Sequence, residues 1–289
     1  MIKPMLLREV DYARPSSVDE AVELLAAHDG ARALAGGQTL ISVMKQRAAA
    51  PDVLVDLALL DELRGIALSA DGSAIEIGAM TTSTAIVDSP VIAKARPVLA
   101  EVTGTIADVQ VRNRGTIGGN VCVNDPTNHL PPLLVALGAS LTIRSRAGER
   151  VVPAEQFFLG VYLTAVDEGE LLTRVSVPVA GAESGDAMSG LTLGRHGTYI
   201  VSAAASVGEN GARIAIGCVD ATPVRATAME SALGGDYSEA SVRAAAAGLG
   251  ASLDPPSDVH ASADYRRHLA EVSAIRAVLE AAKRAKGSK

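Results

Sequence analysis

The sequence is poor in aromatic residues and in basic charge. It has no Trp, two Phe and five Tyr among 289 residues, so its core must be built from Ala, Val, Leu and Ile. Binding of single-stranded nucleic acid needs exposed aromatic rings for base stacking, which this composition disfavours. The formal net charge of −7 gives no basic surface for duplex DNA or an anionic membrane. Because 48% of the residues are apolar, the chain is expected to fold around a hydrophobic core.

Residues that bind metals or act as nucleophiles are also scarce. The two cysteines, Cys122 and Cys218, lie far apart and do not have the C-x-x-C spacing of a metal site. The histidines show no ligand spacing, and no Ser-His-Asp or Cys-His arrangement can be argued from the residue order. We therefore predict no metal site and no catalytic side chain in this protein.

The sequence shows no targeting or membrane segment. Residues 1–10 carry Lys3, Arg8 and Glu9 and lack the apolar stretch of a signal peptide. No uncharged apolar run reaches the roughly 18 residues that a membrane span requires. We expect a cytoplasmic protein without a disulfide, because intracellular thiols are kept reduced.

The length of the chain suits more than one compact unit. We expect an α/β subdomain at residues 1–57, a second subdomain at 58–179 and an α+β domain at 180–289. Residues 180–190 are rich in Gly, Ser and Ala and poor in large apolar residues, so they are predicted to form the boundary before the last domain.

Hydrophobic periodicity and turn residues predict the individual elements. Ser17 and Glu20 form a capping-box pattern at the start of the first helix. Expected helices cover residues 16–27, 40–47, 84–88, 90–103 with a break near Pro97, 131–137, 226–233, 238–247 and 264–286. Expected strands cover residues 31–35, 53–57, 65–69, 74–78, 140–146, 149–153, 171–177, 199–207 and 213–219.

Two glycine motifs are the most informative features. The first glycine motif, Ala35-Gly36-Gly37-Gln38-Thr39, directly follows a short apolar strand. Adjacent glycines allow positive φ angles and close approach of the backbone to a ligand, so successive N–H groups can surround an anion. A helix that begins at residue 39 or 40 would add its unpaired N–H groups, and the Thr39 hydroxyl can bind a phosphate oxygen.

The second glycine motif, Thr116-Ile117-Gly118-Gly119-Asn120, has the same chemistry. It follows Arg112-Asn113-Arg114-Gly115, whose two cations can stabilise negative charge. A lone Gly-Gly pair is usually only a tight turn, and neither motif has the Rossmann or P-loop pattern. Two such motifs that converge on one site suit a diphosphate, as in a dinucleotide.

The whole chain resembles the FAD-binding medium subunit of the molybdenum hydroxylases, which include enzymes of the carbon monoxide dehydrogenase, xanthine dehydrogenase and nicotine or quinoline dehydrogenase type. The resemblance rests on both glycine motifs, on Gln110 and Val111 before the cationic segment, and on Gly169-Glu170-Leu171-Leu172 leading to Pro178, in this order and spacing. It implies an α+β protein with the PCMH-type FAD-binding fold (p-cresol methylhydroxylase-like). In that fold two α/β subdomains precede a C-terminal domain of antiparallel sheet plus helices.

The resemblance places the FAD pyrophosphate at both glycine motifs. The residues implied there are Leu34, Ala35, Gly36, Gly37, Gln38, Thr39, Leu40, Thr116, Ile117, Gly118, Gly119 and Asn120. Ile106 falls where the family places an apolar or aromatic residue near the isoalloxazine, and Leu172 where a leucine contacts the flavin or adenine end. Asn124 and Asp125, in the loop after the second motif, are expected to reach the ribityl hydroxyls.

The sequence departs from the family pattern at two positions. His129 stands where family members often carry an acidic ribityl contact, and an imidazole can still hydrogen-bond a hydroxyl. Tyr199 stands where a stretch usually rich in Lys or Arg, here residues 193–199, ends in Asp. We predict that both side chains lie in the cofactor site; Tyr199 can lie close to the flavin ring there, and a tyrosine buried in a strand for packing alone is the alternative.

The resemblance implies an oxidoreductase subunit that passes electrons from [2Fe-2S] clusters of a small partner subunit through FAD to an external acceptor. Substrate would be hydroxylated at a molybdopterin site in a large subunit of the same heterotrimer. This chain has too few cysteines for a Cys₄ cluster and no room for a molybdopterin domain. Two alternatives remain open: a stand-alone flavin oxidoreductase of the same superfamily and a non-enzymatic nucleotide-binding module. The sequence names neither the substrate nor the acceptor.

Overall fold

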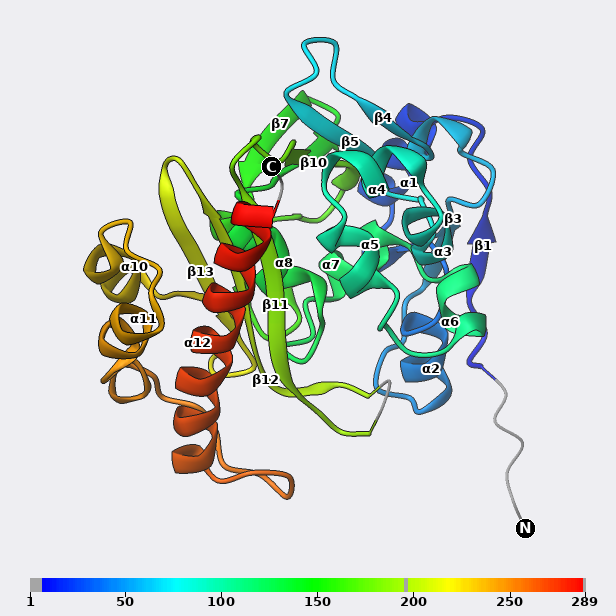
Figure 1. Cartoon of the computed structure of the whole chain (residues 1–289). Helices are drawn as coiled ribbons and strands as arrows, with labels where there is room; N and C mark the ends of the chain where they lie inside the picture. Colours follow the sequence, from blue (N-terminus) through cyan, green and yellow to red (C-terminus); the bar gives the residue numbers. More distant parts are fainter. Residues whose placement is uncertain (1–6, 195–196, 288–289) are drawn as a thin grey trace.

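Three sheets follow one another along residues 7–194 and 197–287, the part of the chain that this computed structural model describes (Figure 1). Residues 1–6 of the stretch considered for a signal peptide, and Arg195 and His196, lie outside these residues. The first sheet is parallel and has the order β1-β3-β2. Its elements are β1 (Asp11–Ala13), α1 (Val18–Ala27), β2 (Ala31–Leu34), α2 (Leu40–Lys45) and β3 (Val53–Asp56).

Helix α1 begins where the capping-box pattern predicts. The Ser17 hydroxyl accepts a hydrogen bond from the N–H of Glu20 at 3.1 Å. The Glu20 carboxylate accepts in return from the N–H of Ser16 at 2.7 Å, one residue earlier than the usual return bond. The apolar side of the helix, with Val22 and Leu25 buried, then packs over the first sheet.

The second sheet is antiparallel and places β10 at its centre, in the order β4-β5-β10-β6-β7. Its strands are β4 (Ile66–Leu68), β5 (Ala74–Gly78), β6 (Ser140–Ser145), β7 (Gly148–Pro153) and β10 (Leu171–Pro178). The helices in this stretch are η1 (Asp61–Leu63), α3 (Ser83–Val87), α4 (Pro90–Ala95), α5 (Val98–Thr103), α6 (Val109–Arg114), α7 (Ile117–Val123), α8 (Leu130–Leu137) and α9 (Ala154–Phe157). A separate hairpin consists of β8 (Phe158–Gly160) and β9 (Leu163–Thr164).

The third sheet is antiparallel, with strands in chain order and helices after them. Its strands are β11 (Gly185–Thr192), β12 (Tyr199–Gly208), β13 (Gly211–Gly217) and β14 (Val224–Arg225). The helices are α10 (Thr227–Leu233), α11 (Glu239–Ala246), η2 (Gly250–Ser252) and the long α12 (Ala263–Gly287), which runs along β11 and β12 (Figure 1). The α+β arrangement predicted from the sequence is therefore observed.

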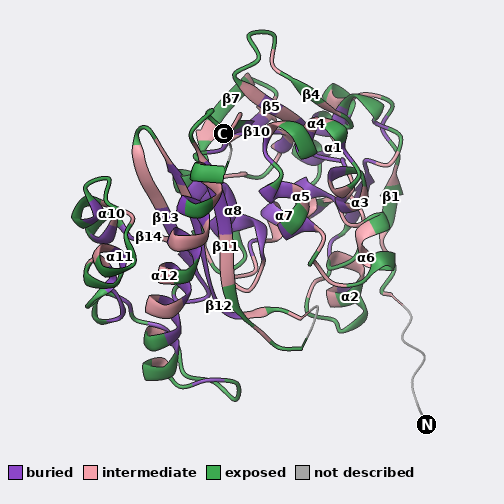
Figure 2. Ribbon diagram, in the orientation of Figure 1, coloured by how far each residue is buried: buried purple, intermediate pink, exposed green. Residues whose placement is uncertain are grey.

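Helix α8 lies between the second and third sheets, and all eight of its residues are buried (Figure 2). Its sequence is apolar on every side, which suits a helix that contacts protein all round. Two arginines also connect the second sheet and its helices to the third sheet. Arg96 donates to both carboxylate oxygens of Asp186 at 2.8 and 2.7 Å, with both side chains buried. Arg213 donates to the last carbonyl oxygens of α8, those of Val135 and Ala136.

The structure corrects the predicted elements in two main places. Residues 180–190 were expected to form a boundary segment, yet most of β11 lies there. Helix α12 requires a glycine at position 185, because a Cβ there would lie 2.1 Å from the carbonyl oxygen of Ala281. The second glycine motif was expected to be a turn, but Gly118, Gly119 and Asn120 lie inside α7. Strand β1, helices α6 and α9 and the β8–β9 hairpin were not predicted.

Candidate functional site

The two glycine motifs lie against each other. A Cβ placed on Gly36 would lie 2.0 Å from the carbonyl oxygen of Arg114 and 3.0 Å from the Cα of Gly115. A Cβ on Gly119 would lie 3.7 Å from that of Ala35. The loop after β2 thus meets the segment between α6 and α7 at a spacing that only glycine allows at position 36.

The first motif has the properties of an anion cradle. In the described part of the chain, the backbone N–H groups of Gly36, Gly37, Gln38 and Thr39 form no hydrogen bond. Gly37 has a φ of +73°, which turns successive N–H groups toward one side, as in an anion-binding nest. Thr39 precedes α2 without capping it through its side chain. Four consecutive unpaired donors at a partly exposed loop are suited to phosphate oxygens.

The second motif cannot act through its backbone in the same way. The N–H groups of Ile117 and Gly118 donate to the carbonyl oxygens of Thr81 and Ala79, at 3.0 and 2.9 Å. Those of Gly119 and Asn120 donate back to Thr116, which caps α7. Neither of its glycines has a positive φ. The structure therefore changes the expected role of these glycines: they let α7 pack closely, and only side chains of this motif remain for a ligand.

The two arginines before the second motif have different surroundings. Arg112 donates from Nη1 to the carbonyl oxygens of Ile106 and Ala107, each at 2.9 Å. Ala107 has a φ of +45°, so this guanidinium holds a strained loop that carries the predicted ring contact Ile106. Arg114 is exposed and has no ion-pair partner among the described residues, so its charge is free to act on an anion.

Two buried polar atoms near the second motif have no partner. They are the side-chain oxygen Oδ1 of Asn120 and Nε2 of His129. Asn128 connects these two residues, because its side-chain amide donates to the carbonyl oxygen of Asn120 at 3.1 Å. A buried donor or acceptor without a partner is costly, so this pair fits a ligand that supplies hydroxyl groups.

His129 and Tyr199, the two departures from the family pattern, are brought together. Their ring centroids lie 4.5 Å apart at an interplanar angle of 49°. Burial lowers the pKa of His129 to about 4, so the imidazole is neutral near pH 7. Burial also raises the pKa of Tyr199, with a smaller contribution from Cys218. The contact joins the start of α8 to the start of β12. We call this pair of uncharged rings, His129 and Tyr199, the uncharged wall.

Asn124 and Asp125 are engaged within the chain. The Asn124 amide donates to the carbonyl oxygens of Gly160 and Leu163, at 2.6 and 3.0 Å, so its two hydrogens are not available to a ribityl chain. The Asp125 carboxylate accepts from Thr127 at 2.7 Å and from the Tyr162 hydroxyl at 3.2 Å. The sequence analysis did not identify Tyr162 and Asn128 as residues of this region. The only available signal was the turn-forming composition of residues 124–128, which is typical of a loop held by its own side chains.

Leu172 shares a hydrophobic core cluster with Ile117 of the second motif, against which Ile106 packs. It lies on β10, is 3% exposed and belongs to the central hydrophobic core. Cys122 is partly buried against the same core, and burial raises its pKa to about 12, which suits a packing role. The described residues contain no group of His, Cys, Asp and Glu side chains that could hold a metal ion.

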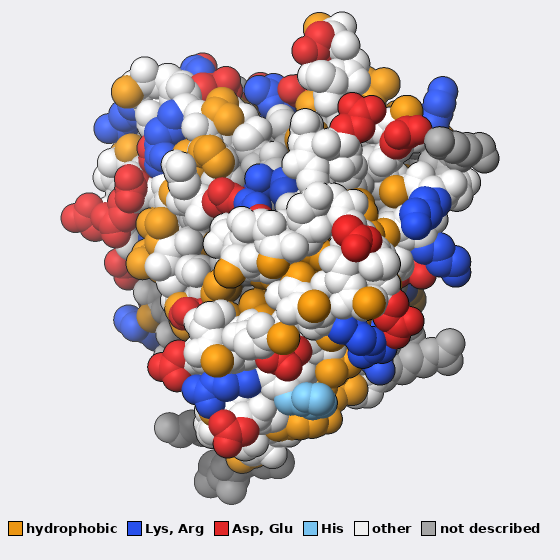
Figure 3. All heavy atoms as spheres, turned by 60° about the vertical axis from the view of Figure 1, so that its left-hand side comes forward, with side chains coloured by type: hydrophobic (Ala, Val, Ile, Leu, Met, Phe, Trp, Pro, Cys, Tyr) orange, Lys and Arg blue, Asp and Glu red, His pale blue; other side chains and the backbone are white. Residues whose placement is uncertain are grey.

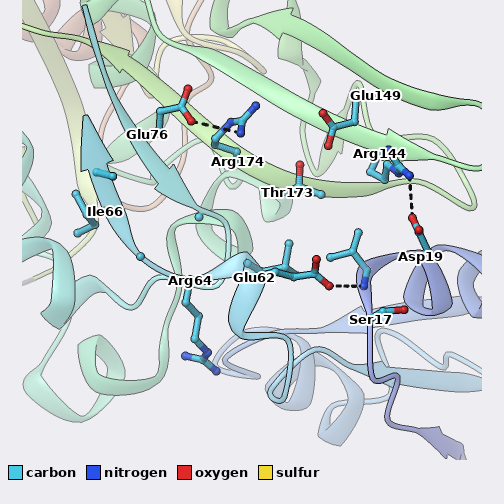
Figure 4. A pocket seen from close by; sticks show the side chains of 15 residues that line it. Ser17, Asp19, Glu62, Arg64, Ile66, Glu76, Arg144, Glu149, Thr173 and Arg174 are labelled. Atoms are coloured by element: carbon cyan, nitrogen blue, oxygen red, sulfur yellow. Dashed lines mark hydrogen bonds and ion pairs between the residues drawn. The ribbon is translucent and has the colours of Figure 1, made fainter. Parts of the chain in front are cut away.

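A separate cleft of about 620 Å³ lies between the start of α1, the η1 region and the second sheet (Figure 4). It contains charges of both signs, and these are largely paired with one another: Arg144 with Asp19 at 2.9 Å, and Arg174 with Glu76 at 3.3 Å. None of the predicted site residues lines it. On the face shown in Figure 3, acidic and basic side chains are interspersed, without an extended positive surface. Among the described helices, none has the length and apolarity to cross a membrane.

Comparison with known proteins gives consistent matches over the whole chain. Residues 8–180 match the FAD binding domain in molybdopterin dehydrogenase, and residues 200–281 match the CO dehydrogenase flavoprotein C-terminal domain. The carbon monoxide dehydrogenase medium chain of Afipia carboxidovorans is 38% identical over 98% of this chain and 100% of its own.

Solved structures show the same similarity. A chain of carbon monoxide dehydrogenase from Hydrogenophaga pseudoflava superposes with a TM-score of 0.92 at 38% identity, covering 96% of this chain and 99% of that one. A chain of quinoline 2-oxidoreductase from Pseudomonas putida 86 superposes with a TM-score of 0.91 at 34% identity, covering 97% and 99%. These enzymes differ in substrate although the compared chains share one fold.

Proposed function

The chain belongs to the FAD-binding medium subunits of the molybdenum hydroxylases, the oxidoreductase family of carbon monoxide dehydrogenase and xanthine dehydrogenase, and we propose that it binds FAD between its two glycine motifs. FAD supplies reversible electron transfer when bound. In this proposal the chain takes electrons from [2Fe-2S] clusters of a small subunit and passes them to an external acceptor. A large subunit with molybdopterin completes a cytoplasmic heterotrimer.

The observation that carries the proposal is the row of unpaired N–H groups in the first motif, held against the second motif at Gly36. These donors would hold the diphosphate, with the free cation of Arg114 nearby. The unpaired Oδ1 of Asn120 and Nε2 of His129 would bind ribityl hydroxyls. Ile106 and Tyr199 would line the flavin ring.

The structure refines which of the predicted site residues we propose as direct contacts. The backbone of residues 36–39 binds, and Leu34, Ala35 and Leu40 shape the loop. Thr116, Ile117, Gly118 and Gly119 position α7 against it. We propose no direct ligand contact for Asn124, Asp125 and Leu172. The first two form hydrogen bonds within the chain, and Leu172 is buried in the core, so all three stabilise the surroundings of the site.

The division into units at residues 1–57, 58–179 and 180–289 is part of the proposal. Each stretch contains one of the three sheets, which supports the division. A stand-alone flavin oxidoreductase would need a proton donor beside the ring. His129 is neutral with a pKa of about 4, and no described feature favours that alternative over the subunit role.

The test is co-expression with and without the genes of the small and large subunits. We expect the purified chain alone, after addition of FAD and removal of unbound FAD by gel filtration, to show the visible absorbance of oxidised flavin, and the co-expressed chain to purify with an iron-sulfur protein. Absence of flavin absorbance, even with added FAD, would refute FAD binding. Flavin absorbance without any iron-sulfur partner would refute the subunit role and favour a stand-alone flavoprotein.

A further inference from the structure

Arg266 of helix α12 is a buried cation far along the chain from both glycine motifs. Its side chain is about 6% exposed. A buried guanidinium is costly unless its donors are satisfied. Here Nη1 donates to the carbonyl oxygen of Ile200 and, at 3.4 Å, to that of Cys218, while Nη2 donates to Asp258 at 2.6 Å; Nε is buried without a partner. One side chain therefore binds two separate strand ends and the loop before its own helix.

Both carbonyl groups lie at the edge of the candidate site. Ile200 follows Tyr199 directly at the start of β12, and Cys218 follows the end of β13. Cys218 has a φ of +67°, an unfavourable conformation for a residue with a side chain, so tertiary contacts must hold it. Cys218 also lies close enough to contribute to the raised pKa of Tyr199. Arg266 thus holds the two strand ends that surround Tyr199.

Tyr199 in turn contacts His129, whose Nε2 is buried without a partner. We infer that Arg266 is a positioning residue of the FAD site: through the carbonyl groups of Ile200 and Cys218 it sets the Tyr199 ring against His129, and so fixes the uncharged wall beside the cofactor. This inference rests on the proposed FAD site. It gives the third sheet and α12 a direct part in shaping the surroundings of the flavin.

The test uses the full chain loaded with FAD, in complex with its partners where they co-purify. Arg266→Lys keeps the charge but cannot bind three acceptors in a fixed fork. Asp258→Ala frees one side of the guanidinium, and the 42% exposure of the Asp258 side chain makes this the milder variant. Val278→Ala is the matched control, because it weakens the same helix in its buried core, away from the strand ends. Tyr199→Ala reports removal of the ring itself.

We expect Arg266→Lys and Asp258→Ala to change the visible circular dichroism and the midpoint potential of bound FAD in the direction seen for Tyr199→Ala. The FAD dissociation constant should rise by about tenfold, as for one lost contact. Val278→Ala should lower stability without these changes. In the double variant Tyr199→Ala/Arg266→Lys, the flavin signals should equal those of Tyr199→Ala alone.

Flavin signals in Arg266→Lys and Asp258→Ala that match those of Val278→Ala would overturn the inference, as would effects that add to those of Tyr199→Ala. Should Arg266→Lys fail to fold, Asp258→Ala decides. A wild-type chain that binds no FAD would instead refute the proposed function, so the two failures are distinguishable.

Discussion

Replacement of Gly37 by alanine separates backbone strain from cofactor binding. Gly37 has a φ of +73°, and Gly72, in the turn between β4 and β5, has almost the same φ of +72°. A residue with a Cβ costs about 1–2 kcal/mol in this conformation. Nothing lies within 4 Å of a Cβ on Gly72, and a Cβ on Gly37 meets only flexible side chains, Ile41 at 3.3 Å and Leu34 at 3.5 Å. The two substitutions should therefore lower stability to a similar extent.

Only Gly37→Ala should weaken FAD binding. Relaxation of residue 37 toward negative φ rotates the N–H groups of the first motif away from a common anion. Loss of one hydrogen bond to a charged group amounts to about 1.5–3 kcal/mol. This corresponds to an increase of the dissociation constant of about tenfold to a hundredfold. Gly72→Ala, remote from both motifs, should bind FAD as the wild type does.

The assays are urea unfolding of the apoprotein and titration with FAD followed by quenching of flavin fluorescence. The expected pattern is two variants with similar losses of unfolding free energy but different FAD affinities. If Gly37→Ala binds FAD as tightly as Gly72→Ala, the unpaired N–H groups of residues 36–39 do not hold the diphosphate, and the reasoning fails.

Two further predictions concern stability. Arg96→Ala leaves the Asp186 carboxylate, 5% exposed, without its cation, so the free energy of unfolding in urea should fall by about 3–5 kcal/mol. Recovery of most of that loss in Arg96→Met/Asp186→Leu would support this cause, and a loss below about 1 kcal/mol would contradict it. Burial lowers the pKa of His129 from 6.5 to about 4, so between these values the unfolded apoprotein binds a proton that the folded one does not. Titration of His129 alone should lower the free energy of unfolding by up to about 3 kcal/mol as pH decreases from 6.5 to 4; His129→Gln should flatten this part of the profile, whereas the exposed His28→Gln should not.

Local signals in the sequence predicted most of the helices and strands. The capping box at Ser17 and the break near Pro97 are both observed, because each depends on neighbours a few residues away. Strand β11 was missed because half of its residues are Gly, Ala or Ser, which have little β propensity. They form a strand because they pair with β12, and Gly185 lets α12 approach the sheet closely; both are properties of the packed molecule and not of the segment.

The candidate site was predicted in part. Both glycine motifs were recognised from their composition, and the structure places them in contact at Gly36. The two motifs have similar sequences, but in the folded protein only the first keeps unpaired backbone N–H groups. The N–H groups of the second motif meet carbonyl groups of Ala79 and Thr81, which arrive from a distant part of the chain. Leu172 packs in the core, and its contact with the flavin or adenine end stays a prediction.

By itself the sequence determined the family, the α+β class and the two motifs, since these depend on residue types and their order along the chain. Only the tertiary structure decided which donors are free, because an N–H group is available to a ligand when no other part of the chain pairs with it. It also decided that His129 and Tyr199 touch, since they lie on α8 and β12, which meet through long-range packing. The same packing brings Arg266, near the far end of the chain, to the edge of that contact.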